Sequence, residues 1–188
     1  MIFSFGMEGA LGLSPELPVR SDWETWAASG RPFPESDGRI SSPDIPMMLS
    51  RRLLPGDRAA VEVLLHLQKD ADLVPDFVVF ASRHGELLRS VTMLSSLADD
   101  GTVSPTEFSN SVQNTPAAYY SMVSGNHAES VSLSSGDDIV TMALTEASAA
   151  IMSGDAKCCG LAFYENPVSN AIMEIPRDGP SSGTFAAG

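Results

Sequence analysis

The stretch SVSLSSGDDIVTMALTEASAAIMSGDA, residues 130–156, predicts a strand, a tight turn and a helix in immediate succession. Val131 and Leu133 alternate with serines, which is the two-residue period of a strand with one buried face. From Asp137 to Ser153 the apolar residues instead recur at helical spacing, and Gly154 follows as a stop signal. The residues that this spacing turns toward the core are Val140, Ala143, Leu144, Ala147 and Ile151. The stretch therefore predicts an α/β protein.

The turn in this stretch places side chains above a helix N-terminus, where negative charge is stabilised. Many enzymes hold a nucleophile at such a turn, but the two residues that enter this helix are Asp137 and Asp138. Aspartates are favoured in a first helical turn, so the simplest interpretation is that they cap the helix. Neighbouring helical residues point about 100° apart, so the two carboxylates do not readily share one metal ion or proton.

Ser134 and Ser135 are the alternative nucleophiles at the turn. Their context, L-S-S-G-D, lacks the first glycine of the G-x-S-x-G motif of serine hydrolases. A serine nucleophile also needs a base, and no histidine of the chain stands in a motif that identifies one. The residues around the turn therefore favour helix capping over catalysis.

The elements outside this stretch alternate between strands and helices. The expected strands are residues 2–9, 76–84, 130–134, 158–165 and 171–175, and the expected helices are 21–30, 55–70, 85–100, short turns from 104 and 137–153. Ser21 is the expected N-cap of the first helix. Such alternation predicts one mostly parallel five-stranded sheet with helices on both faces. We expect a single domain over residues 1–175, followed by a flexible tail rich in Gly, Ser and Pro at 176–188.

Charge and hydropathy exclude several classes of partner. The formal net charge is −13, and a surface of that sign repels phosphate backbones and anionic lipid, so neither nucleic acid nor a membrane surface is expected as a partner. No run of about 18 apolar residues is present, which predicts no membrane-spanning helix. The apolar N-terminus lacks the basic region of a signal peptide, so the cytoplasm is the expected location.

The cysteines and histidines indicate neither a disulfide framework nor a metal centre. Cys158 and Cys159 are sequence neighbours, and a bridge between them would be strained and would close no useful loop. Both lie in an apolar run and are expected to behave as small buried side chains. His66, His84 and His127 are scattered without metal-ligand spacing. We therefore predict no metal and no cofactor.

A series of short patterns follows in one register from Ser104 to Glu165. They are Ser104-Pro105, Asn114, Ala117-Ala118, Gly125, Ser130-Val131-Ser132, Gly154-Asp155-Ala156 and the strand-ending Glu165. In this order they resemble the N-terminal half of a β-ketoacyl synthase, the condensing enzyme of fatty-acid and polyketide synthesis. The resemblance implies half of a thiolase/ketosynthase-type fold. The part of the chain before Ser104 resembles the family only in its order of elements.

The same register implies that the chain cannot condense acyl groups by itself. Asp137 occupies the position of the family's nucleophilic cysteine, and a carboxylate cannot form the transferable thioester. The family's C-terminal half supplies two histidines, and this chain is expected to lack that half. The resemblance therefore implies a non-catalytic, chain-length-factor-like subunit, as in type II polyketide or aryl polyene systems. Its partner would be an active β-ketoacyl synthase, and acyl carrier protein would bind through that partner only.

Two groups of residues acquire roles from the resemblance. The family dimer pairs the strand before the nucleophile across a twofold axis, which here comprises Ser130, Val131, Ser132, Leu133 and Ser134. The preceding segment would reach toward the partner's acyl tunnel, and its candidate tunnel or gate residues are Gln113, Asn114, Thr115, Tyr119, Tyr120 and Met122. For Tyr119, Tyr120 and Met122, ordinary core packing is an equally open interpretation.

Two other classes of function remain open. A free-standing acyl-transfer or hydrolytic enzyme would use Ser134, Ser135 or Cys159 as its nucleophile. A bare α/β module that binds an acyl ligand would behave as a stable monomer. A strand with an exposed edge is prone to aggregation, and pairing with a partner strand removes that liability, so the strand itself also favours a dimer.

Overall fold

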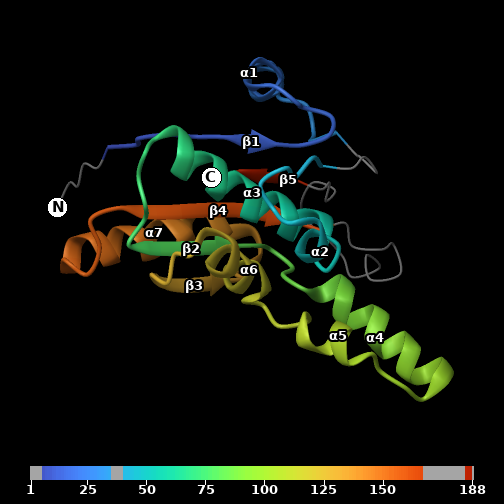
Figure 1. Cartoon of the computed structure of the whole chain (residues 1–188). Coiled ribbons are helices and arrows are strands. Elements are labelled where there is room, and N and C mark those ends of the chain that lie inside the picture. Colours follow the sequence, from blue (N-terminus) through green and yellow to red (C-terminus); the bar gives the residue numbers. More distant parts are fainter. Residues whose placement is uncertain (1–5, 35–39, 167–184, 188) are drawn as a thin grey trace.

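Three neighbouring parallel strands form most of the sheet in the computed structural model, which describes residues 6–34, 40–166 and 185–187 (Figure 1). Strand β2 (Phe77–Ala81) lies between β3 (Glu129–Leu133) and β4 (Cys159–Glu165) and pairs in parallel with both. Strand β5 (Phe185–Ala187) runs antiparallel to β4, and β1 (Gly12–Leu13) runs antiparallel to β5. The strand order β1-β5-β4-β2-β3 leaves β3 at one edge of the sheet.

Helices cover both faces of this sheet. Helices α3 (Pro55–Asp70) and α6 (Thr115–Ser124) pack on one face, and α7 (Ile139–Ser153) packs on the other. Strand β2 is buried throughout: Val78 and Phe80 belong to the core under α3 and α6, whereas Val79 belongs to the core under α7. This arrangement confirms the predicted α/β fold, and the predicted bounds of α3 are reproduced at both ends.

The buried face of α7 differs from the prediction. Ala143 and Ala147 are buried as expected, but Val140 and Leu144 are exposed and Ala150 is buried instead. Helix α7 is apolar almost all round, so periodicity alone cannot select one face. Small alanine side chains allow the helix to lie close against the sheet, and the stripe of alanines therefore faces inward.

The predictions near the two chain ends need correction. Residues 6–9 of the expected first strand are irregular, and the strand is at Gly12–Leu13; residues 2–5 lie outside the described residues. The end of the expected flexible tail forms β5, held between β4 and β1. The expected strand at 171–175 and the rest of the tail, 176–184 and 188, lie outside the described residues. A three-residue strand is too short for its period to be recognised in a sequence.

Helix α1 (Arg20–Ser29) begins one residue before the predicted start. Its N-cap is Val19, whose backbone N–H donates to Asp22 Oδ2 over 3.3 Å, so the prediction of Ser21 as N-cap is wrong. A short helix, α2 (Met47–Ser50), lies between α1 and α3. No helix in the described ranges has the length and hydropathy needed to cross a membrane.

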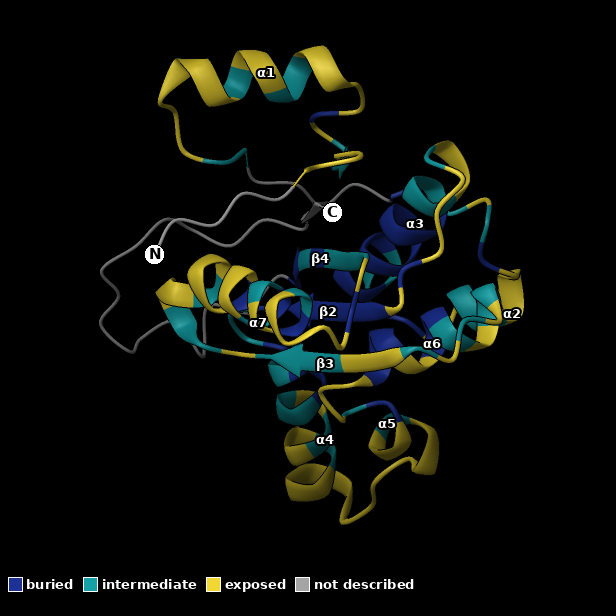
Figure 2. Ribbon diagram, turned by 90° about the vertical axis from the view of Figure 1, so that its left-hand side faces the viewer, coloured by how far each residue is buried: buried dark blue, intermediate teal, exposed yellow. Residues whose placement is uncertain are grey.

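Helices α4 (Leu87–Asp100) and α5 (Pro105–Ser109) project from the body beside β3 (Figure 2). Ser104 caps α5, because its Oγ accepts from the Glu107 N–H over 3.4 Å. The apolar spacing of α4 predicts a helix correctly, but it does not mark a core face: Leu94 is 65% exposed. We call the exposed apolar side chains of this region the α4–α5 surface, which comprises Leu94, Leu97, Val103, Phe108 and Val112.

Candidate functional site

The three parallel strands bring polar side chains together where they end, at the carboxyl-terminal edge of the sheet. This edge is distinct from the open edge of β3. Arg83 and His84 follow β2, Ser134 follows β3, and Glu165 ends β4. Parallel strands point the same way, so residues far apart in the sequence meet where the strands end. Ligand sites of α/β proteins usually lie at this edge, which makes it the candidate functional site.

Glu165 is the common acceptor of this cluster. Its Oε1 accepts a hydrogen bond from the Ser82 hydroxyl over 3.3 Å and another from the Arg83 backbone N–H. Its Oε2 lies 3.1 Å from Nδ1 of His84. Both side chains of the His84–Glu165 pair are largely buried, so the carboxylate fixes the orientation of the imidazole ring.

A pocket of about 250 Å³ lies beside His84. Its lining residues are His84, Gly85, Glu86, Leu87, Ser90, Ser111, Gln113 and Ser134. Two of the residues selected from the sequence, Gln113 and Ser134, therefore meet at one site. The lining is mainly polar, unlike the apolar lining that typifies a pocket for a drug-sized ligand.

The turn before α7 carries an ion pair in place of a nucleophile. A short 3₁₀ helix, η1 (Gly136–Asp138), leads into α7, and Gly136 takes the left-handed conformation with φ 57°. Asp137 Oδ1 lies 2.6 Å from Arg83 Nη2. Asp138 occupies the N-cap position of α7 and both aspartates lie in η1 as this helix begins, but neither makes a side-chain capping hydrogen bond within the described residues. Asp137 instead joins the turn to the end of β2.

The hydroxyl and thiol candidates differ in their surroundings. Ser134 Oγ donates to the Arg83 carbonyl oxygen over 2.9 Å, and Ser135 Oγ has no hydrogen-bond partner within the described chain. Cys159 begins β4 at the opposite end of the strand from Glu165, and its thiol contacts the Ala147 carbonyl oxygen over 3.6 Å. Burial raises the pKa of Cys159 to about 11, which leaves the thiol protonated and unreactive at neutral pH.

A network of buried acidic side chains lies next to the pocket and joins α3, α4 and the end of β4. Asp57 is fully buried and accepts from the Asn166 side-chain amide over 2.7 Å and from the Leu54 N–H over 3.1 Å. Glu86 lines the pocket, and the Asp57 carboxylate lies near it; Glu86 Oε1 is buried without a hydrogen-bond donor among the described residues. Because Asp57 accepts from two N–H donors and Glu86 Oε1 from none, we assign the proton of this acid pair to Glu86.

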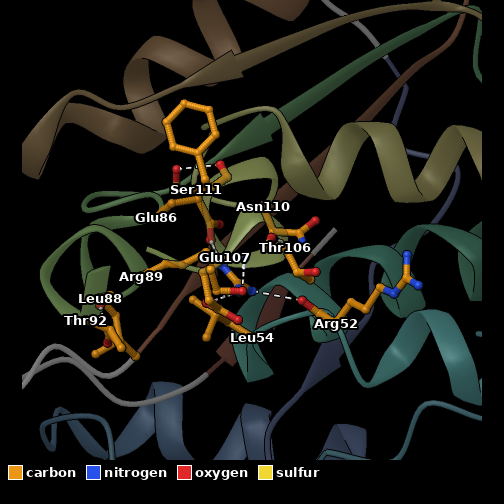
Figure 3. Close-up of polar contacts among 12 residues, drawn as sticks. Arg52, Leu54, Glu86, Leu88, Arg89, Thr92, Thr106, Glu107, Asn110 and Ser111 are labelled. Atoms are coloured by element: carbon orange, nitrogen blue, oxygen red, sulfur yellow. Dashed lines mark hydrogen bonds and ion pairs between the residues drawn. The ribbon is translucent and has the colours of Figure 1, made fainter. Parts of the chain in front are cut away.

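Arg89 holds this network to the α4–α5 region (Figure 3). Its Nε donates to Glu86 Oε2 over 3.3 Å, and its Nη1 donates to Glu107 Oε2 over 2.7 Å. Its Nη2 donates to the Arg52 carbonyl oxygen over 2.9 Å. Burial, together with the nearby Asp57 carboxylate, raises the pKa of Glu86 to about 9, so Glu86 is protonated at neutral pH.

The tunnel and gate candidates separate into buried and exposed residues. Tyr119 and Tyr120 are buried, and the Tyr120 hydroxyl donates to Gln68 Oε1 over 2.8 Å on α3. Thr115 is also buried, and its hydroxyl donates to backbone carbonyls. These three residues are part of the core of this chain, and their role in a tunnel or gate stays a prediction. Gln113, Asn114 and Met122 are exposed.

The predicted interface strand is an edge strand with the predicted alternation. Val131 and Leu133 pack into the core under α7, and the outer edge of β3 pairs with no strand in the described ranges. Ser130 and Ser134 are exposed, whereas the Ser132 hydroxyl is buried without a hydrogen-bond partner among the described residues. The strand therefore offers five residues of backbone to a partner.

Several residues of the site were missed by the sequence analysis. Arg83, His84 and Glu86 belong to one polar run, SRHGE, which directly follows the buried strand β2. A polar run at the carboxyl end of a buried strand is a recognisable signal. Asp57 and Asn166 gave no signal, because only the tertiary structure brings their elements together. One His/acid group, Asp44 with Glu62 and His66, lies elsewhere and is close enough for a metal ion.

The comparisons with known proteins identify the family. The family described as "Beta-ketoacyl synthase, N-terminal domain" matches residues 23–187, so this chain belongs to it. No curated protein matches the chain. Membership confirms the resemblance drawn from Ser104 to Glu165 and extends it over almost all of the chain.

Two solved structures are similar to this one. The first is a ketosynthase (ApeO) in complex with its chain length factor (ApeC) from Xenorhabdus doucetiae: the TM-score is 0.85 at 28% identity, covering 95% of this chain and 74% of that chain. The second is a β-ketoacyl synthase from Burkholderia phymatum STM815, with a TM-score of 0.68 at 17% identity. That match covers 96% of this chain but 56% of the other, and it shows the fold alone.

Proposed function

We propose that this chain is a non-catalytic, chain-length-factor-like subunit. It would pair with an active β-ketoacyl synthase and shape the acyl tunnel during type II polyketide or aryl polyene biosynthesis. The observation that carries this proposal is the Arg83–Asp137 ion pair at the start of α7. In the family register this is the position of the nucleophilic cysteine, and a carboxylate held by a guanidinium cannot carry an acyl thioester.

The open edge of β3 supplies the surface for a partner. An edge strand invites pairing, and proteins usually block it with lysine, proline or a covering element. The sequence of β3, ESVSL, contains neither residue, and no described element pairs with its outer side. The similarity to a ketosynthase bound to its chain length factor supports a partner of the ketosynthase kind.

Helices α4 and α5, which carry the α4–α5 surface, lie beside β3 (Figure 2). Leu94 on α4 and Phe108 on α5 are 65% and 66% exposed. Contiguous exposed apolar groups mark interaction surfaces. A partner that pairs with β3 would cover them as well, and Gln113 would then lie near the contact.

The net charge of −13 argues against direct docking of another acidic protein. Acyl carrier proteins are strongly acidic in this family's pathways, so we propose that the ketosynthase subunit binds the carrier. The exposed residues Gln113, Asn114 and Met122 remain candidates for shaping the tunnel. The cytoplasm remains the location that this role would require.

Co-expression with an active ketosynthase of the same organism tests the proposal. We expect a stable one-to-one complex by size-exclusion chromatography with light scattering, and we expect the chain alone to aggregate. The controls are each subunit expressed alone, and a ketosynthase from unrelated fatty-acid synthesis. The proposal would be overturned if the chain is a stable monomer and does not bind the cognate ketosynthase.

A second candidate, a serine-dependent hydrolase or acyltransferase, is favoured by one specific observation. Glu165 orients His84 through Nδ1, and His84 and Ser134 line the same pocket. A serine, a histidine and a carboxylate in this order are the parts of a catalytic triad. However, the Ser134 hydroxyl donates to a backbone carbonyl, and that bond would have to break before His84 could act as its base.

A fluorophosphonate probe separates the two candidates. We expect no labelling of the chain, either alone or in the complex, because the Ser134 hydroxyl donates to the Arg83 carbonyl oxygen and not to His84. Labelling that disappears in Ser134→Ala and in His84→Ala, but persists in Ser135→Ala, would instead establish the serine enzyme. An active serine hydrolase added to the same sample serves as the control for probe quality.

A further inference from the structure

Three side chains that are not part of the strand-end site converge between α3 and the segment before α2. Glu62 and His66 are four residues apart on α3 and therefore share one face of the helix. Asp44 comes from the turn before α2. One ligand atom from each residue lies within 4.8 Å of the other two. The group combines one imidazole with two carboxylates.

Two of the polar atoms in this group are buried and lack a hydrogen-bond partner within the described residues. Glu62 is only 1% exposed; its Oε1 accepts from the Asp44 N–H over 3.1 Å, whereas its Oε2 has no partner. His66 Nδ1 lies 3.6 Å from Asp44 Oδ2, which is too long for a hydrogen bond, and it also has no such partner. A buried carboxylate oxygen without a donor is costly unless a cation or proton satisfies it.

We propose that Asp44, Glu62 and His66 bind one divalent transition-metal ion of the Zn²⁺ class. Zn²⁺ accepts imidazole nitrogen and carboxylate oxygen at about 2.0–2.2 Å, with water completing a tetrahedral site. Ligand atoms of such a site are separated by roughly 3.3 Å, so the 3.6 Å between His66 Nδ1 and Asp44 Oδ2 needs little adjustment. Mg²⁺ and Ca²⁺ fit less well, because both prefer oxygen ligands.

One positively charged side chain of the protein lies beside this site. Lys69 Nζ is paired with Oδ1 of Asp44. Its side chain is mostly exposed and leaves Asp44 Oδ2 turned toward His66, so metal binding does not require its displacement. The ion would join the turn containing Asp44 to the middle of α3. Its role would be structural, and it would be independent of the proposed ketosynthase partnership.

To test the inference, the metal-free chain without an affinity tag is titrated with ZnCl₂ at pH 7.5. Calorimetry measures the binding, and metal analysis after gel filtration measures the Zn²⁺ that stays bound. If the chain needs its ketosynthase for solubility, the complex is titrated and the ketosynthase alone is subtracted. We expect one Zn²⁺ per chain, and a rise in Tm of about 5–10 °C at a 100-fold excess over Kd. His66→Ala should weaken binding at least tenfold, whereas His127→Ala should leave it unchanged, because His127 contacts Ser121 away from the cluster.

Cobalt distinguishes this site from the adjacent thiols Cys158 and Cys159. Co²⁺ bound by imidazole and carboxylate gives only weak visible bands, whereas thiolate ligation adds an intense near-ultraviolet charge-transfer band. We expect the weak bands, unchanged in the double variant C158S/C159S. The inference is overturned if the wild-type chain binds less than one equivalent of Zn²⁺ and its Tm does not change. It is also overturned if His66→Ala binds Zn²⁺ as wild type does, or if the thiolate band appears.

Discussion

A chain that carries Ser130→Pro and Ser132→Pro should fold normally and fail to retain an active ketosynthase. The Leu133 carbonyl oxygen accepts from the Ser82 N–H, so the backbone groups of Leu133 face β2. Backbone groups alternate between the two sides of a strand, so the N–H groups of Ser130 and Ser132 face the open edge. Proline is tolerated at such positions because the N–H that it removes is not used within the sheet.

We expect the double proline variant to weaken association at least about 100-fold. Two lost hydrogen bonds and two obstructing rings cost on the order of 3 kcal/mol, and each 1.4 kcal/mol is tenfold in affinity. The matched control is S130A/S132A, which removes the same hydroxyls but keeps both N–H groups and should bind as wild type does. Affinity is measured on the co-expressed complex, and circular dichroism with Tm checks the fold. A folded proline variant that still forms the one-to-one complex would show that β3 is not the interface.

Glu86→Gln should flatten the pH dependence of stability. The pKa of Glu86 is raised from 4.5 to about 9 in the folded chain, chiefly by burial and then by the Asp57 carboxylate. Between these values the folded chain holds one proton more than the unfolded chain. The contribution of Glu86 is therefore fully present below pH 4.5 and is lost as the pH rises toward 9. Because of Glu86, the free energy of unfolding of the wild type should fall by up to about 1.4 kcal/mol per pH unit in this range.

A glutamine at position 86 presents an amide N–H to Asp57 without having to hold a proton. The free energy of unfolding of the variant should therefore exceed that of wild type by a growing amount as the pH rises, and by at least about 1 kcal/mol at pH 8. Urea unfolding at whole pH units from 5 to 9 measures the difference. Glu107→Gln is the control, because Glu107 also contacts Arg89 but is partly exposed. Parallel curves for wild type and Glu86→Gln would contradict the assignment of the proton to Glu86.

The Asp137 prediction illustrates how far a sequence pattern reaches. The pattern located the turn, and the family resemblance marked Asp137 as the altered nucleophile position. It did not reveal that Arg83, 54 positions earlier, holds the carboxylate, because that contact depends on β2 and β3 being neighbours. The burial of the aromatic gate candidates depends on the same kind of contact. Tyr119 and Tyr120 lie in the core that α3 covers within the same chain, and their role as a gate stays a prediction.

Local patterns by themselves determined the helix at 55–70, the buried strand after Asp76, and the strand-turn-helix unit from Ser130 to Ser153. These depend on periodicity, capping and stop signals, which act over a few residues. The tertiary structure alone decided which face of α7 is buried, that residues 185–187 form a strand, and that His84 meets Glu165. Those outcomes depend on the order of strands in the sheet, because hydrogen bonding and burial join residues that no local period connects.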